Sequence, residues 1–244
     1  MIAGQARADI ISQLKKDVLF QRFSKSPSNL FSEITIQPLT DNFHFNRFPL
    51  GAVHEFICHT QESGAASTGF IAAIFHSFMK NNGRVLWVST KQNIFPPAFA
   101  SFGLSPENIF FIHPQKEKDV IHIVEDALHC KGIAAVVSTV QDLNFKQSRR
   151  LQLATESSGV TSFVLRSAPK NINATASVAR WNIQPATSRN TGLLPGVGFP
   201  CWKVDLLKTK NGKPGSWVFA WQSGRFIHLI EQAPAIYLHQ KKAV

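Results

Sequence analysis

The chain has 244 residues, of which 44% are apolar and only 17% charged, and its 26 basic residues outnumber its 15 acidic ones to give a formal charge of +11. An apolar fraction near the globular average with so few charges excludes a disordered or coiled-coil chain and predicts one compact domain. No apolar run approaches the roughly 18 to 20 residues that cross a bilayer, and the N-terminus lacks an export-signal pattern. We therefore expect a soluble, cytoplasmic protein.

The first elements in chain order are an amphipathic helix and a polar linker. Apolar positions at helical spacing predict a helix over residues 8–23, and the serines and prolines of residues 24–49 predict a loop-rich tether. We divide the chain accordingly into an N-terminal helix and linker (1–47), a core (48–230) and a C-terminal tail (231–244).

An alternation of strands and helices begins at Gly51. Strands are expected at 53–58, 84–89, 109–112, 133–138 and 160–165. Helices are expected at 65–79 and 119–130, with a third that Asp142 caps and that ends near Gly159, and a short helical turn follows Pro96. Successive βα units predict an α/β fold with a mostly parallel sheet flanked by helices on both faces.

The pattern changes after Ser167. Residues 179–183, 202–208 and 217–221 read as strands joined by hairpin turns at Asn211-Gly212 and Ser223-Gly224. About 75 residues of strands without helices would hardly close a core of their own. We therefore expect antiparallel strands that extend the same sheet.

The excess positive charge lies in the last third of the chain. Residues 146–225 carry 12 basic side chains against only Glu156 and Asp205, whereas residues 1–145 are neutral overall. This asymmetry predicts an anionic partner, with nucleic acid the commonest and an acidic protein the next; a solvated basic surface is the alternative. The candidate DNA-binding residues are Lys146, Arg149, Arg150, Lys208, Lys210 and Lys213.

Tryptophans accompany these lysines, and two interpretations of them stay open. Trp202, Trp217 and Trp221 alternate with basic residues and could stack on bases. At strand spacing, however, Trp217, Phe219 and Trp221 share one face, so core packing explains them equally well.

The sequence contains no pattern typical of a metal site, a disulfide framework or a catalytic triad. The three cysteines stand more than 70 residues apart, and the nine histidines show no H-x-x-x-H or H-E-x-x-H arrangement. No G-x-S-x-G elbow appears either. We expect no metal, no cofactor and no catalytic residue of these kinds, and read the histidines as surface or satisfied core groups.

The default phosphate site of such a fold is the loop between the first strand and its helix. Here that loop, residues 59–69, has few glycines and no lysine, so it lacks the groups that wrap and neutralise a triphosphate. A nucleotide-hydrolysing site also needs an aspartate at the end of a buried strand to hold magnesium, and here Ser138 occupies that position. These losses argue against nucleotide hydrolysis, although weak phosphate binding by the helix N-terminus stays open. The remnants of the phosphate loop are Glu62, Ser63, Gly64, Ser67 and Thr68.

Seven short stretches, in this order, resemble the ImuA family, the RecA-like accessory proteins of bacterial mutagenic repair. They are GAVHEF (51–56), AAVVS (134–138), SRRLQLA (148–154), SGVT (158–161), ARW (179–181), WKVDLLK (202–208) and GKPGSW (212–217). The resemblance covers about residues 48–226.

The resemblance implies a RecA-like core with a degenerate ATP site, acting in DNA-damage-induced (SOS) mutagenesis and translesion synthesis. The implied partners are ImuB, an inactive relative of the Y-family polymerases, and an error-prone replicative-type polymerase, with RecA and DNA as further candidates. The protein would be a non-catalytic adaptor. The DNA-binding loops of RecA correspond to residues 139–146 and 167–179, both shorter here, which argues against a RecA-style grip on DNA.

Two further positions depart from RecA. Its ATP-sensing glutamine is replaced by Arg166-Ser167, and its water-activating acidic residue is absent from Thr90-Lys91-Gln92. Two alternatives to the adaptor remain. One is a P-loop-type ATPase acting on DNA with unconventional ligands, in which Lys91 substitutes for the missing lysine. The other is a cell-division inhibitor of the SulA type.

Overall fold

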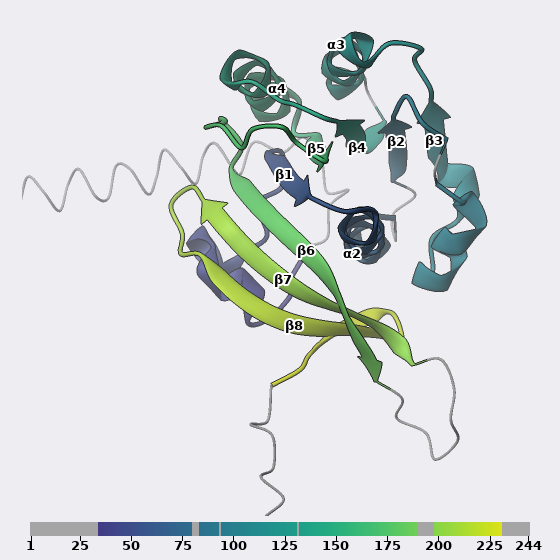
Figure 1. Ribbon diagram of the computed structural model, residues 1–244, viewed down its shortest axis with the longest axis vertical. Coiled ribbons are helices and arrows are strands. Elements are labelled where there is room, and N and C mark those ends of the chain that lie inside the picture. Colours follow the sequence, from purple (N-terminus) through teal and green to yellow (C-terminus); the bar gives the residue numbers. More distant parts are fainter. Residues whose placement is uncertain (1–33, 80–82, 93, 131, 190–197, 231–244) are drawn as a thin grey trace, which may run out of the picture.

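The computed structural model describes residues 34–79, 83–92, 94–130, 132–189 and 198–230, and these form one nine-stranded sheet with helices on both faces (Figure 1). The strand order is β3-β2-β4-β5-β1-β6-β7-β8-β9. The strands are β1 (Val53–Cys58), β2 (Arg84–Val88), β3 (Ile109–Ile112), β4 (Ile133–Val140), β5 (Thr161–Ser167), β6 (Ala179–Arg189), β7 (Phe199–Thr209), β8 (Gly215–Gln222) and β9 (Arg225–His228). The helices are α2 (Gln61–Met79), α3 (Glu117–Leu128) and α4 (Phe145–Ser158), with short 3-10 helices η1 (Leu39–Asn42), η2 (His44–Asn46), η3 (Pro96–Phe102) and η4 (Pro106–Asn108).

The sheet is parallel on one side and antiparallel on the other, as the sequence predicts. Strands β3, β2, β4, β5, β1 and β6 pair in parallel, whereas β7, β8 and β9 pair antiparallel to their neighbours. Strand β6 joins the two halves because it lies parallel to β1 and antiparallel to β7. The predicted α/β fold class is confirmed, as is the extension of a single sheet.

Two apolar layers hold the helices to the sheet. Helix α2 packs on one face in a cluster that includes Trp87, Trp181 and Phe219. Helices α3 and α4 cover the other face through a second cluster, in which Val136 and Val164 of the sheet meet aliphatic side chains of both helices. The alternation of side chains along each strand assigns neighbouring residues to opposite layers.

Helix α4 begins with a cap that differs from the prediction. Asn144, not Asp142, is the N-cap: its side chain accepts a hydrogen bond from the Gln147 backbone N–H at 2.8 Å, and the Gln147 side chain accepts one from the Asn144 N–H at 3.0 Å. This reciprocal pair satisfies two helix-start donors. Asp142 binds Arg166 instead. The helix ends at Gly159, whose φ of 78° suits a residue without a Cβ.

Part of the predicted linker is packed. Residues 34–48 form η1, η2 and flanking turns, and most of their apolar side chains are buried in the α2-side layer; the buried ones are Ile34, Ile36, Leu39, Phe43 and Phe48. This part of the predicted loop-rich stretch is therefore packed on the core, because its apolar residues lie beside β6 and β1. The predicted helix at 8–23 and the tail 231–244 lie outside the described residues.

Candidate functional site

The segment expected to be a phosphate loop is a helix. Only His59 and Thr60 separate β1 from α2, so Glu62, Ser63, Gly64, Ser67 and Thr68 all lie within α2. The expectation of a loop over residues 59–69 was wrong. Without a run of glycines, nothing holds the backbone in the wide turn that wraps a phosphate, and the residues after Thr60 continue as a helix.

The start of α2 is closed by its own side chains. Thr60 Oγ1 accepts from the Ser63 N–H at 3.2 Å, and Ser63 Oγ accepts from the Thr60 N–H at 3.0 Å. The Gly64 N–H binds the Thr60 carbonyl at 3.1 Å. Hydrogen bonds from Thr60 and from its own backbone hold the pKa of Glu62 below its usual value, which places a negative charge at the positive end of the helix. A phosphate would have to displace these contacts and oppose that charge.

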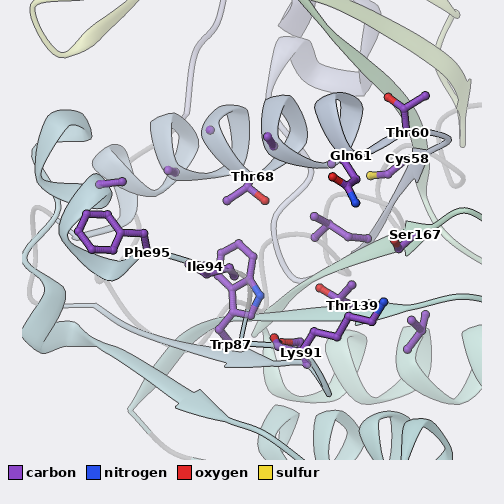
Figure 2. Close-up of a pocket in the computed structure, with 18 of the residues that line it drawn as sticks. Cys58, Thr60, Gln61, Thr68, Trp87, Lys91, Ile94, Phe95, Thr139 and Ser167 are labelled. Atoms are coloured by element: carbon purple, nitrogen blue, oxygen red, sulfur yellow. The ribbon is translucent and has the colours of Figure 1, made fainter.

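A pocket of about 910 Å³ lies beside this helix start, at the carboxyl ends of β1, β4 and β5 (Figure 2). Its polar side is formed by Thr60, Gln61, Lys91, Thr139, Gln141 and Ser167. Its apolar side is formed by Trp87, Ile94, Phe95, Phe99, Phe102 and Trp202. Thr68 and Gly64 also line it, so two of the predicted residues face this pocket.

Cys58 lines the same pocket but is a poor nucleophile. Burial raises the pKa of its thiol, outweighing the effect of the hydrogen bond to Ser67 Oγ at 3.5 Å. The thiol is therefore protonated at neutral pH, and only a thiolate attacks efficiently.

Ser138 is not at the end of its strand. Strand β4 continues to Val140, and the residues of this strand that line the pocket are Thr139 and Val140. Ser138 is fully buried, and its hydroxyl has no hydrogen-bond partner in the described part of the chain. The strand outruns the prediction because the β-branched residues after Ser138 keep pairing with β5.

The predicted basic residues of α4 divide into two groups. Lys146 and Arg149 are exposed on the first turns of the helix. Arg150 binds Glu125 of α3 through two nitrogens, its Nε lying 3.0 Å from Glu125 Oε1. Arg150 therefore ties the two helices together, and part of its charge is already compensated.

The lysines of the β7–β8 hairpin are exposed, and two of them, Lys208 and Lys210, lie beside the loop formed by residues 168–178. Lys208 Nζ donates to the Thr175 carbonyl at 2.9 Å, and the Lys210 N–H binds the Val178 carbonyl at 2.7 Å. Lys213 lies in the turn just before β8, where its N–H binds the Asn42 carbonyl of η1 at 3.0 Å.

The 168–178 loop connects the two predicted basic segments. The Ala176 N–H donates to Ser148 Oγ of α4 at 2.9 Å, while Thr175 accepts from Lys208. The start of α4 and the hairpin therefore flank the same loop, which adds the exposed Lys170. We call this surface the basic face; its residues are Lys146, Arg149, Lys170, Lys208 and Lys210.

A buried ion-pair network beneath this loop was missed by sequence reasoning. Arg166 Nη1 lies 2.9 Å from Glu55 Oε1, and both side chains are fully buried. Arg180 Nε lies 3.0 Å from Glu55 Oε2, which also accepts from Thr175 and Ser177 at 2.6 and 2.9 Å. A glutamate and an arginine inside otherwise apolar strand segments were the signal that could have revealed it.

The network keeps Glu55 ionised and anchors the loop. Burial by itself would raise the pKa of Glu55, but the hydrogen bond from Thr175 and the two arginines outweigh it, so its pKa lies below the usual value. Arg166 also donates to the Asn171 carbonyl at 2.5 Å. Arg166 thus points away from the pocket, which Ser167 lines. Arg166 and Arg180 are neutralised internally and add little to the basic face.

No family model matches the chain. Two curated proteins do, both called Protein ImuA, from Caulobacter vibrioides strains NA1000 / CB15N and ATCC 19089 / CIP 103742 / CB 15. Each is 30% identical over 182 residues, which span 70% of this chain and 75% of the relative. The chain belongs to the ImuA family.

The structure of this ImuA-family member also bears on the role of the tryptophans and on the prediction about membrane-spanning segments. Trp202 and Trp221 are buried, and Trp217 packs against the same cluster, so core packing is confirmed over base stacking for these rings. In the part of the chain with assigned positions, no helix is long and apolar enough to cross a membrane.

His54 is a satisfied core histidine in this ImuA-family member. Its Nε2 lies 2.6 Å from the Pro49 carbonyl, and its Nδ1 accepts from Trp181 Nε1 at 3.3 Å. The ring also stacks on Phe48. Burial lowers its pKa from 6.5 to about 4, against the opposing effect of the Pro49 hydrogen bond, so the ring is neutral at pH 7.

Proposed function

We propose that this ImuA-family protein is a non-catalytic adaptor in DNA-damage-induced mutagenesis and translesion synthesis, which joins an ImuB-like polymerase relative to DNA or RecA. Family membership supports the pathway, because the resemblance implies this role for ImuA proteins. The self-capped start of α2 carries the non-catalytic part of the proposal. Donors that would hold a triphosphate are used by Thr60 and Ser63, and no lysine stands among residues 59–69.

The proposal includes a RecA-like core whose ATP site has degenerated. The parallel order β3-β2-β4-β5-β1 and the place of the pocket at the carboxyl ends of the strands support this relationship. Ser138 lies inside β4 and does not line the pocket, so the position assigned to the magnesium-holding aspartate offers no ligand there. An error-prone replicative-type polymerase is a further proposed partner.

The decisive measurement of the non-catalytic role is ATP binding and turnover by the purified full chain. We expect no saturable ATP binding by calorimetry and no turnover above the buffer rate. Turnover that Thr68→Ala abolishes would contradict the adaptor role. Lys91 lines the pocket and is the observation that favours the alternative ATPase, so Lys91→Ala is the matched test of that alternative.

The partner is tested by co-purification with an ImuB-like protein of the same organism. We expect a complex that survives size-exclusion chromatography at physiological salt. Preferential binding to a tubulin-like division protein would instead favour the SulA-type alternative and contradict the proposal.

The proposed DNA contact is the basic face, together with Lys213 at the hairpin. Exposed lysines there can neutralise phosphates without reading bases, so we expect sequence-independent binding that weakens steeply with salt. Replacing Lys208, Lys210 and Lys213 together by Glu should lower the slope of log affinity against log salt by about 2 to 3.

A control variant distinguishes the effect of where positive charge is lost from the effect of how much is lost on DNA affinity. Arg225 is exposed at the other end of β8, so Arg225→Glu reduces the positive charge away from the hairpin. This variant should keep most of the affinity in fluorescence anisotropy with labelled DNA. Equal losses in the two variants, after correction for the number of charges, would remove the hairpin from the proposed interface.

A further inference from the structure

The wall of the pocket formed by residues 94–102 has the character of a protein-binding surface. This stretch, IFPPAFASF, contains no charged residue, and Phe95 at its rim is 71% exposed. Phe102 and Trp202, whose rings stack with their centroids 6.3 Å apart, also line the pocket, as does the buried Phe99. An exposed aromatic side chain at the rim of a cavity with an apolar lining is typical of a site that receives a partner's side chains.

The pocket also holds a buried donor without a partner. The Trp87 ring forms part of its floor, and the Trp87 Nε1–H has no hydrogen-bond acceptor in the described ranges of the chain (Figure 2). An unpaired buried N–H is costly, and native proteins rarely leave one. An acceptor such as a peptide carbonyl, brought in by a ligand, would satisfy it.

The charges of the pocket favour an acidic ligand. Lys91 and Glu117 are the two charged residues of its described lining, and a Glu117 carboxylate oxygen already accepts the Gln141 N–H. Lys91 forms no ion pair with any residue whose position is described, and Figure 2 shows it extending beside Thr139 on the polar side of the pocket. Lys91 is therefore the charged side chain of the pocket that is available to bind a negatively charged group of a ligand.

We infer that this pocket binds an extended segment of a partner protein, with an aromatic or branched aliphatic side chain inserted against Trp87, Phe102 and Trp202 and an acidic residue bound to Lys91. The inference rests on the proposed adaptor role, since it assigns to the partner a surface of the chain. In an ATPase this cavity would hold a nucleotide, whereas here it binds a segment of a partner protein.

Gly64 provides a blocking variant that the fold tolerates. It lies in α2 and lines the pocket, and a Cβ at this position meets no atom within 4 Å. Gly64→Leu therefore extends a side chain into the pocket while improving helix propensity. Gly64→Ala is the matched control, because its single methyl group leaves most of the cavity open.

The direct test uses a short capped peptide with alternating leucine or phenylalanine and acidic residues, and a counterpart with lysines in place of the acids. Indole N–H signals in ¹⁵N–¹H NMR report binding, with Trp87→Phe assigning the signal of the unpaired donor. We expect the acidic peptide to shift the indole N–H signals of Trp87 and Trp202, and the basic peptide to leave these signals unchanged. Lys91→Ala should weaken binding about fivefold, and Lys118→Ala, outside the pocket, should not.

Several outcomes would overturn the inference. These are unmoved indole signals, equal affinity in Lys91→Ala and wild type, or shifts produced by ATP and not by the peptide. Co-purification then separates the two proposals. If wild type fails to bind the ImuB-like protein, the proposed function fails; if wild type, Gly64→Ala and Gly64→Leu all bind equally, the adaptor role stands and the pocket is not its docking site.

Discussion

The buried Glu55 carboxylate offers the strongest single perturbation of this fold. Glu55→Ala removes the acceptor of Arg166, Arg180, Thr175 and Ser177 at once. Arg166 would remain fully buried, with its closest other carboxylate on Asp142 at 3.3 Å, where that side chain is 48% exposed. The substitution therefore leaves a guanidinium charge with little compensation inside the protein.

The expected cost follows from that burial. Removing one partner of a buried ion pair destabilises a protein by about 3–5 kcal/mol, because the other charge stays desolvated. A domain of this kind has a free energy of unfolding of about 5–15 kcal/mol, so Glu55→Ala should remove between about a fifth of it and nearly all of it. Replacing both Glu55 and Arg166 by apolar residues of similar volume should cost less than the sum of the single changes, since it removes both charges.

Urea unfolding followed by tryptophan fluorescence measures these values. The control is Glu125→Ala, which breaks the more exposed pair with Arg150 and should cost about 0.2–1 kcal/mol. If Glu55→Ala costs no more than Glu125→Ala, the network does not stabilise the fold as argued. Hydrogen exchange of the 168–178 loop should rise in Glu55→Ala, because Arg166 and Arg180 no longer anchor it.

Two further predictions concern acid stability and helix propensity. Because the pKa of His54 is lowered from 6.5 to about 4 on folding, the unfolded chain binds more protons between these values, and stability should fall as the pH decreases from about 6.5 to 4, by ~3 kcal/mol in total. The lowered pKa of Glu55 acts in the same direction below its unfolded pKa, so stability is lost as the pH falls through its folded value. His54→Phe should flatten the upper part of this pH dependence in chemical denaturation, and an unchanged profile would contradict the assignment. Gly64→Ala should raise the free energy of unfolding by about 0.5–1 kcal/mol, because its Cβ meets open space within α2; a loss of stability would contradict the description of that helix turn.

Much of the fold follows from local patterns in the chain. The apolar run of β4 and the stripe of α3 determine where strands and helices form, and Asn211-Gly212 forms the hairpin turn that the sequence predicts. These signals are readable because each depends on residues a few positions apart. The fold class and the presence of a single extended sheet follow from their order along the chain.

The chemistry of the site depended on contacts between distant residues. Glu55 and Arg166 are 111 positions apart, and only the pairing of β1 with β5 makes them an ion pair. Residues Glu62 to Thr68 were likewise predicted to form a loop but form a helix. The lack of a glycine run excludes a phosphate-wrapping loop without predicting a helix, whereas the hydrogen bonds between Thr60 and Ser63 show that a helix begins here.

Sequence alone therefore determined the order of strands and helices, the charge of the last third of the chain and the resemblance to ImuA proteins. Tertiary structure decided which of those charges are neutralised inside, which surround the 168–178 loop, and that an uncharged wall and an unpaired indole N–H meet in one pocket. The physical reason is that secondary structure is encoded by local periodicity, whereas burial and ion pairing are set by strand register and layer packing across the whole chain.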